Sequence, residues 1–136
     1  MGDILALTVE HLMLSAAGVG LALVVGIPLA ILITRYRTLA GFTMAVTDVL
    51  QTIPSMALLA ALMIYLGLGN QTLVVTLMIY SLLPIVRNTY TGITGIDKGL
   101  IEAGKGMGMT RWQLLRMVQI PVALPVIMAG IRVAMV

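Results

Sequence analysis

Two long runs without a charged residue constrain this chain more than any other feature of its sequence. The first, Leu12–Thr34, has 23 residues, and the second, Val49–Val86, has 38. At a rise of about 1.5 Å per residue, the first run forms a helix about 34 Å long, enough to cross a hydrocarbon core about 30 Å thick. Only 10% of the 136 residues are charged, whereas soluble domains average about 25%. The sequence therefore predicts an all-α, polytopic integral membrane protein.

The second run is too long for one crossing, since as a single helix it would measure about 57 Å. The strong turn signal inside it is the glycine-rich sequence at 67–72. The three full crossings are therefore expected at about 12–34, 42–66 and 72–90. The chain turns apolar again after Pro121, where a fourth crossing is expected to start. The result is a helical bundle forming one transmembrane domain over 1–136, which we expect to be C-terminally incomplete.

Lysine and arginine are distributed unequally between the connections. The connection at 35–41 and the stretch 87–117 hold seven of them, whereas the N-terminal arm and the turn at 67–72 hold none. Cytoplasmic connections of membrane proteins are enriched in basic residues. The sequence thus predicts a multi-pass protein of the plasma (cytoplasmic) membrane, with an outside N-terminus and a cytoplasmic segment at about 91–120. Topology also explains the net charge of +3, so we expect no nucleic-acid partner.

Few residues suit catalysis, cofactor binding or metal binding. The chain has no cysteine and one histidine, His11, whereas a metal site needs several ligands. We interpret His11 as an interfacial polar residue. Gly104–Thr110 is glycine-rich but lacks the residue order of a phosphate-binding loop. We therefore expect no metal, no cofactor and no enzymatic activity, and any ATP hydrolysis must take place in a partner.

The predicted cytoplasmic segment begins with the signals of a short helix. Asp97 is a suitable N-cap for a helix over 98–107, and Gly108 suits a left-handed stop. Three glycines fall inside this helix, at Gly99, Gly104 and Gly106. Glycine costs about 1 kcal/mol against alanine in a helix interior. Such a composition fits either close backbone approach to another element or an ordinary flexible loop, and the residues alone do not decide between them.

A second helix follows the glycine turn. Thr110 and Gln113 have the spacing of a capping box, and Pro121 is expected to end the helix. The apolar stripe of this helix contains Leu114, Met117 and Val118, widened by Trp112 and Leu115. A short helix with this much apolar surface must bury it against the membrane interface, the bundle or another protein. The segment is thus predicted to be a helix-turn-helix outside the bilayer.

The spacing of this segment resembles that of a known loop. Glu102-Ala103-Gly104 is followed after three residues by Gly108, and after nine more by Val118-Gln119-Ile120-Pro121. This pattern resembles the EAA loop of ABC importer permeases, with small or apolar replacements at three of its positions. In that family the loop docks a separate ATP-binding subunit. The resemblance implies that the ATPase-coupling residues are Glu102, Ala103, Gly104, Gly108 and Pro121.

Other stretches are similar to the compatible-solute branch of that superfamily, which imports glycine betaine, choline, carnitine and related quaternary amines. These stretches are Gln51–Leu59, Pro84–Thr89, Gly95–Asp97 and Pro125–Arg132. The resemblance implies a permease subunit that works by alternating access. Its implied partners are an ATP-binding subunit, a second permease chain in a homo- or heterodimer, and an extracytoplasmic solute-binding protein or domain. The alternative is a truncated or non-transporting membrane scaffold that keeps only the ATPase-docking surface.

The second and third crossings supply candidates for lining a translocation path. These are Gln51, Thr52, Pro54, Pro84 and Asn88. The two prolines fit either kinks in pore-lining helices or ordinary packing, and Asp48 fits either a functional charge at membrane depth or an interfacial one. The chain has one Trp, one Phe and four Tyr, too few for an aromatic cage around a quaternary amine. Selectivity is therefore expected to lie in the solute-binding partner.

Overall fold

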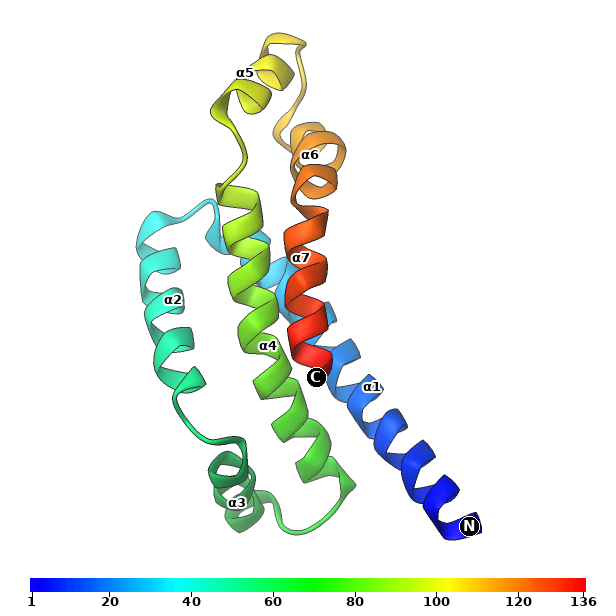
Figure 1. The fold of residues 1–136 in the computed structure, drawn as a ribbon. Coiled ribbons are helices and arrows are strands. Elements are labelled where there is room, and N and C mark those ends of the chain that lie inside the picture. The colour runs from blue at the N-terminus through cyan, green and yellow to red at the C-terminus, as the bar shows by residue number, and fades with distance from the viewer.

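The computed structural model describes residues 1–136, apart from the side chain of Arg37. Its elements in chain order are α1 (Gly2–Ile33), α2 (Arg37–Gln51), α3 (Ser55–Leu66), α4 (Asn70–Thr94), α5 (Lys98–Gly106), α6 (Arg111–Leu114), the π-helical turn η1 (Leu115–Gln119) and α7 (Ile120–Met135). Helix α4 is central, because α1, α2, α3 and α7 all pack against it (Figure 1). Helices α5 and α6 lie beyond one end of α4 and α7 (Figure 1). The predicted all-α membrane class is confirmed.

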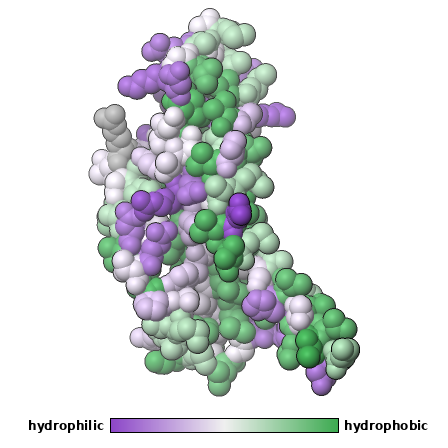
Figure 2. Space-filling model, in the orientation of Figure 1, coloured by the Kyte–Doolittle hydropathy of each residue, from purple (hydrophilic) through white to green (hydrophobic). Residues whose placement is uncertain are grey.

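Three helical stretches are long and apolar enough to cross a membrane: α1, α4 and the continuous stretch Arg111–Met135. Helix α1 starts ten residues before the expected crossing at 12–34 and, with 32 residues, is about 48 Å long. The helix is exposed from Gly2 to Met13. Figure 2 shows mainly hydrophobic surface over this part of α1, and hydrophilic surface at the α5–α6 end and in a band beside α2 and α4.

The expected crossing at about 42–66 is not one continuous helix. Helices α2 and α3 are bent by 98° at the break between Gln51 and Ser55. The N–H groups of Thr52 and Ile53 donate to carbonyls only three residues back, each at 3.1 Å, and Pro54 is extended at ψ 137°. A proline lacks the N–H that would continue the helix and disfavours helical geometry in the preceding residue. The pair is a fourth candidate crossing only if it is counted as one broken span.

Helix α1 packs on α4 through a stripe of small residues. The buried members of the stripe are spaced by four: Gly18, Ala22, Gly26 and Ala30. A Cβ added at Gly18 would lie 2.7 Å from the Cβ of Leu77 and 3.3 Å from its carbonyl carbon. Small residues at this spacing let two membrane helices approach closely. The close approach of α1 to α4 therefore depends on the absence of a Cβ atom at Gly18.

Helix α7 packs on the other end of α4 in a similar way. A Cβ added at Gly130 would lie 2.6 Å from the Cβ of Asn88 and 2.9 Å from the carbonyl oxygen of Pro84. The Asn88 side-chain amide donates to the carbonyl of Val126 at 3.1 Å. A buried apolar cluster adjoins this contact and contains Ile93, Ile96, Ala123 and Ile127. The proline and the asparagine of α4 are therefore part of its contact with α7.

The expectation that Pro121 ends the second cytoplasmic helix is wrong. The helix continues from Arg111 to Met135 over 25 residues, and this continuous stretch is one of the three candidate crossings. The N–H of Ile120 donates to the carbonyl of Leu115, five residues back, in the widened turn η1. A proline ring normally clashes with the carbonyl four residues earlier. A π-helical turn adds room at that point, which explains how the helix passes through Pro121.

Candidate functional site

The connection between α4 and α7 folds as the helix-turn-helix that its sequence predicts. Asp97 accepts a hydrogen bond from the N–H of Gly99 at 3.2 Å and so caps α5. At the other end, Gly108 has φ +84°, and its N–H donates to the Lys105 carbonyl at 3.0 Å. The N–H of Met109 donates to the Gly104 carbonyl at 3.2 Å. These two bonds form a Schellman motif, whose left-handed residue is usually glycine, so the predicted left-handed stop is confirmed.

The capping box at the start of α6 is also confirmed. The N–H of Gln113 donates to the Thr110 hydroxyl at 3.3 Å, and the N–H of Thr110 donates to the Gln113 side chain at 3.0 Å. Each bond satisfies a backbone donor that the helix itself leaves free. The Schellman motif ends at Met109, and the capping box begins at the next residue, Thr110. Together they fix the direction in which α6 leaves α5.

Gly104 decides between the two explanations for the glycines of α5. It is buried, and a Cβ added there would lie 2.5 Å from Cδ1 of Leu114 and 3.4 Å from Sδ of Met109. Gly106, in contrast, has nothing within 4 Å of an added Cβ. Close backbone approach is therefore the explanation at Gly104, where α5 meets α6, and does not apply at Gly106.

The remaining coupling candidates present a different surface. Glu102, Ala103, Gly108 and Pro121 are exposed. The predicted apolar stripe of the second helix is only partly buried, because Leu114 and Leu115 are 6% and 5% exposed whereas Trp112 and Met117 are 64% and 62% exposed. The segment thus offers a carboxylate and two large apolar side chains outside its own core. Exposed apolar side chains of this kind are typical of a surface that another protein or the membrane interface covers.

A second feature is a polar cavity of about 640 Å³ between α1, the α2–α3 break, α4 and the end of α7. Among the side chains that line it, polar groups come from three parts of the chain: His11, Ser15, Gln51, Ser55, Thr76, Tyr80 and Ser81. We call this space the polar cavity. Thr76 and Ser81 are buried, whereas His11, Gln51 and Ser55 are exposed. Polar side chains at membrane depth are candidates for a functional site.

The structure brings together two of the five predicted pore-lining residues. Gln51 and Pro84 both line the polar cavity. Thr52 and Pro54 lie at the α2–α3 break, where the Thr52 hydroxyl donates to the Val49 carbonyl at 2.6 Å, and Asn88 joins α4 to α7. Within the described part of the chain, these last three are not among the residues of the polar cavity.

Most of the residues that line the polar cavity were not predicted from the sequence. His11 and Ser15 come from α1, where His11 was expected to be merely interfacial. They are four residues apart and so lie on one face of the helix, a signal that the sequence does contain.

Asp48 also has a role that the sequence left open, since it forms an ion pair with Arg87 of α4. The two side chains are 53% and 45% exposed.

Comparisons with known proteins identify the family of the chain. The profile of the family described as binding-protein-dependent transport system inner membrane component matches residues 22–136. The chain belongs to this family. The resemblance to ABC importer permeases that rests on the spacing of 102–121 is thereby confirmed.

Individual relatives narrow the likeness. This inner membrane component is 58% identical over 127 residues to the glycine betaine/carnitine/choline transport system permease protein OpuCD of Bacillus subtilis (strain 168). The matched residues make up 93% of this chain and 56% of that relative. This chain is 52% identical over 127 residues to the carnitine transport permease protein OpuCD of Listeria monocytogenes serotype 1/2a (strain 10403S), with 93% and 57% covered. It is 50% identical over 141 residues to the osmoprotectant import permease protein OsmW of Salmonella typhimurium, with 99% and 65% covered. The chain thus spans little more than half the length of the first two relatives.

Proposed function

We propose that this chain is part of the permease subunit of an ATP-driven importer for a quaternary-amine osmoprotectant. The observation that carries the proposal is the helix-turn-helix at 97–121, which exposes Glu102 and continues without interruption into α7. A partner that binds α5 and α6 would be joined mechanically to a membrane-crossing helix. The proposed partner at this surface is an ATP-binding subunit whose nucleotide cycle moves α7.

The polar cavity supports the transport part of the proposal. Its hydroxyl, amide and imidazole groups lie beside α4, the helix against which the other long helices pack. The solute class is proposed from the relatives, whose names include glycine betaine, carnitine and choline. Tyr80 is the one aromatic side chain among the described residues that line the cavity, whereas a quaternary amine is usually held by several. We therefore assign selectivity to an extracytoplasmic solute-binding protein or domain, and the path itself to a pair of permease chains.

Uptake measurements test this function. The whole protein is produced with its ATP-binding and solute-binding partners in cells without osmoprotectant uptake of their own, and entry of labelled glycine betaine, carnitine and choline is followed. We expect ATP-dependent uptake of at least one of them. Replacing Gln51 by leucine is expected to slow uptake about fivefold, the effect of losing one hydrogen bond worth about 1 kcal/mol.

Thr52→Val is the matched control, because Thr52 is the next residue but is not among those that line the polar cavity. It should leave uptake within the scatter of the unchanged protein. If both substitutions slow uptake equally, the polar cavity is not part of the solute path. Normal recovery of the ATP-binding subunit without uptake of any of the three solutes would instead favour a scaffold that docks the subunit but does not transport.

We also propose an outside N-terminus. Arg35 follows the end of α1, and the basic residues of α5, α6 and η1 lie at the same end of the molecule (Figure 1). The opposite end carries the N-terminus and the turn before Asn70 (Figure 1). Basic residues collect on the cytoplasmic side of membrane proteins. The α5–α6 end is therefore assigned to the cytoplasm.

Single cysteines test this orientation without background, because the chain has none of its own. With an impermeant thiol reagent on intact cells, Asn70→Cys should be labelled and Lys105→Cys should not. Both positions are exposed, so both should react once the cells are permeabilised. Labelling of Lys105→Cys but not Asn70→Cys in intact cells would reverse the orientation.

A further inference from the structure

A pocket of about 450 Å³ lies where the ends of α1 and α4 meet α5, α6 and η1. We propose that it binds the phosphate headgroup of an anionic phospholipid. The residues that carry the argument are Arg35, Lys105, Arg111, Gln119, Ile31 and Ile93, all of which line it. We call this space the basic pocket. It is separate from the polar cavity and shares no lining residue with it.

Charge indicates the class of ligand. Arg35 follows α1, Lys105 is in the last turn of α5, and Arg111 begins α6, so three separate segments each bring one cation to the pocket. None of its described lining residues is acidic. Among the described side chains, these three cations form no ion pair with a carboxylate. Like charges held close together repel one another, and a bound anion would remove that repulsion.

The position of the pocket indicates where the anion comes from. Ile31 and Ile93 belong to the last turns of α1 and α4, which are both candidate membrane crossings. The pocket therefore lies at the level where two crossings end, with apolar side chains on one side and cations on the other. Basic pockets between membrane helices at this level bind the headgroups of anionic lipids.

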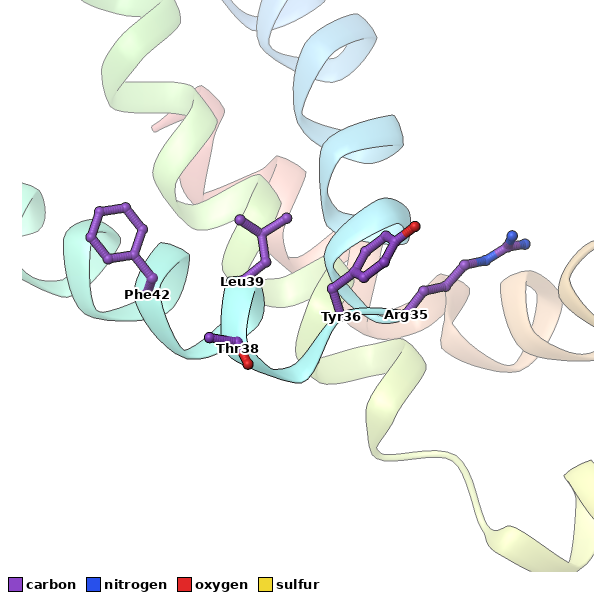
Figure 3. Close-up of a pocket in the computed structure, with 5 residues that line it drawn as sticks. All are labelled: Arg35, Tyr36, Thr38, Leu39 and Phe42. Atoms are coloured by element: carbon purple, nitrogen blue, oxygen red, sulfur yellow. The ribbon is translucent and has the colours of Figure 1, made fainter.

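A neighbouring hollow supplies a place for an acyl chain. It measures about 770 Å³ and is lined by Arg35, Tyr36, Thr38, Leu39 and Phe42. Tyr36, Leu39 and Phe42 are 57%, 43% and 70% exposed. Figure 3 shows the Arg35 side chain extending away from Leu39 and Phe42, toward the side where α5 and α6 lie. Arg35 lines both spaces, so a single lipid can place its phosphate on one side of Arg35 and a chain on the other. A soluble anion has no apolar chain that could bind in this hollow.

Lipid binding to the purified chain tests the proposal. The chain in detergent is titrated with phosphatidylglycerol or with phosphatidylcholine, and bound lipids are counted by native mass spectrometry. We expect clear preference for phosphatidylglycerol. Each basic residue near a membrane surface contributes about fivefold to the binding of an anionic lipid. The combined change Arg35→Gln, Lys105→Gln and Arg111→Gln should therefore abolish the preference, and Arg35→Gln alone should weaken it about fivefold.

Lys98→Gln combined with Arg116→Gln is the matched control. Both residues are basic and exposed in the same region but are not among those that line the basic pocket, so the preference should persist. If circular dichroism shows that the triple variant is not folded, the Arg35→Gln variant alone is used to test the proposal. Equal binding of the two lipids, or an unchanged preference in the Arg35→Gln variant, would overturn the proposal. Displacement of the lipid by excess inorganic phosphate would identify a soluble-anion site and also overturn it.

Discussion

Replacing Gly18 by valine is expected to force α1 away from α4 and to lower the free energy of unfolding by about 1–3 kcal/mol, the usual cost of overpacking a core. A Cβ at this position would lie 2.7 Å from the Cβ of Leu77 and 3.3 Å from the backbone nitrogen of Met78. Neither atom is the free end of a flexible side chain, so relief requires movement of a helix backbone. The measurement is thermal or denaturant unfolding of the purified protein in detergent, followed by circular dichroism.

Gly20→Val is the matched control for this experiment. Gly20 is two residues away on the same helix, and nothing lies within 4 Å of a Cβ added there. Both variants carry the same change in helix propensity, so the difference between them reports the α1–α4 contact alone. Equal unfolding curves for the two variants would show that the small-residue stripe does not set the distance between these helices.

The second large effect is expected in the helix-turn-helix at 97–121, where the ATP-binding subunit is proposed to dock. Gly108 has φ +84°, where a β-branched residue is strained by about 1–3 kcal/mol. Gly108→Val should therefore redirect α6 and reduce recovery of the ATP-binding subunit about tenfold, which corresponds to about 1.4 kcal/mol. Glu102→Lys should also reduce recovery, through reversal of an exposed charge. The measurement is co-purification of the ATP-binding subunit with the whole protein, alongside a blot of the membrane fraction.

Gly106→Val is the control for the effect at Gly108. Gly106 lies two residues earlier in the last turn of α5, and a Cβ added there meets nothing within 4 Å. Its substitution should leave the ATP-binding subunit bound. Normal recovery with both Gly108→Val and Glu102→Lys would mean that 97–121 is only a connection. Loss of the variants from the membrane fraction would mean that the segment is needed for folding instead.

The local features of this segment could be predicted from its sequence because the bonds that make them span few residues. Asp97 caps α5 through a residue two positions away, and Thr110 and Gln113 are three apart. The left-handed turn at Gly108 is likewise closed by bonds to residues three and five positions back. Within such short spans, the residue types alone restrict the backbone to few conformations.

The two prolines show where sequence reasoning fails. Pro54 was assigned to the middle of one crossing but separates two helices bent by 98°, whereas Pro121 was expected to end a helix and lies inside one. The same residue type gives opposite results because the outcome depends on the preceding turn. At Pro121 that turn widens to a π-helical geometry, and at Pro54 it tightens and stops. Packing against the rest of the molecule selects between these two geometries. No short sequence pattern predicts that packing.

The candidate sites were predicted only in part for a related reason. Gln51 and Pro84 were chosen for their chemistry, but the polar cavity also contains His11 and Ser15, which lie at least 36 residues from Gln51 in the sequence. The basic residues were used to predict the orientation, whereas their meeting in one pocket depends on how α6 leaves α5. Side-chain chemistry is visible in a sequence, but the convergence of distant segments follows from the packed arrangement of helices.

The stripe of small residues on α1 has a consequence for biogenesis. Helix α1 ends at Ile33, whereas its partner α4 ends at Thr94, so 61 residues must be added between the completion of one and of the other. At about 5–20 residues per second, translation of that length takes about 3–12 s. During this interval α1 must remain in the bilayer without the surface that its glycines fit, held by its own apolar length. The contact at Gly18 can therefore form only once synthesis has passed Leu77 and Met78.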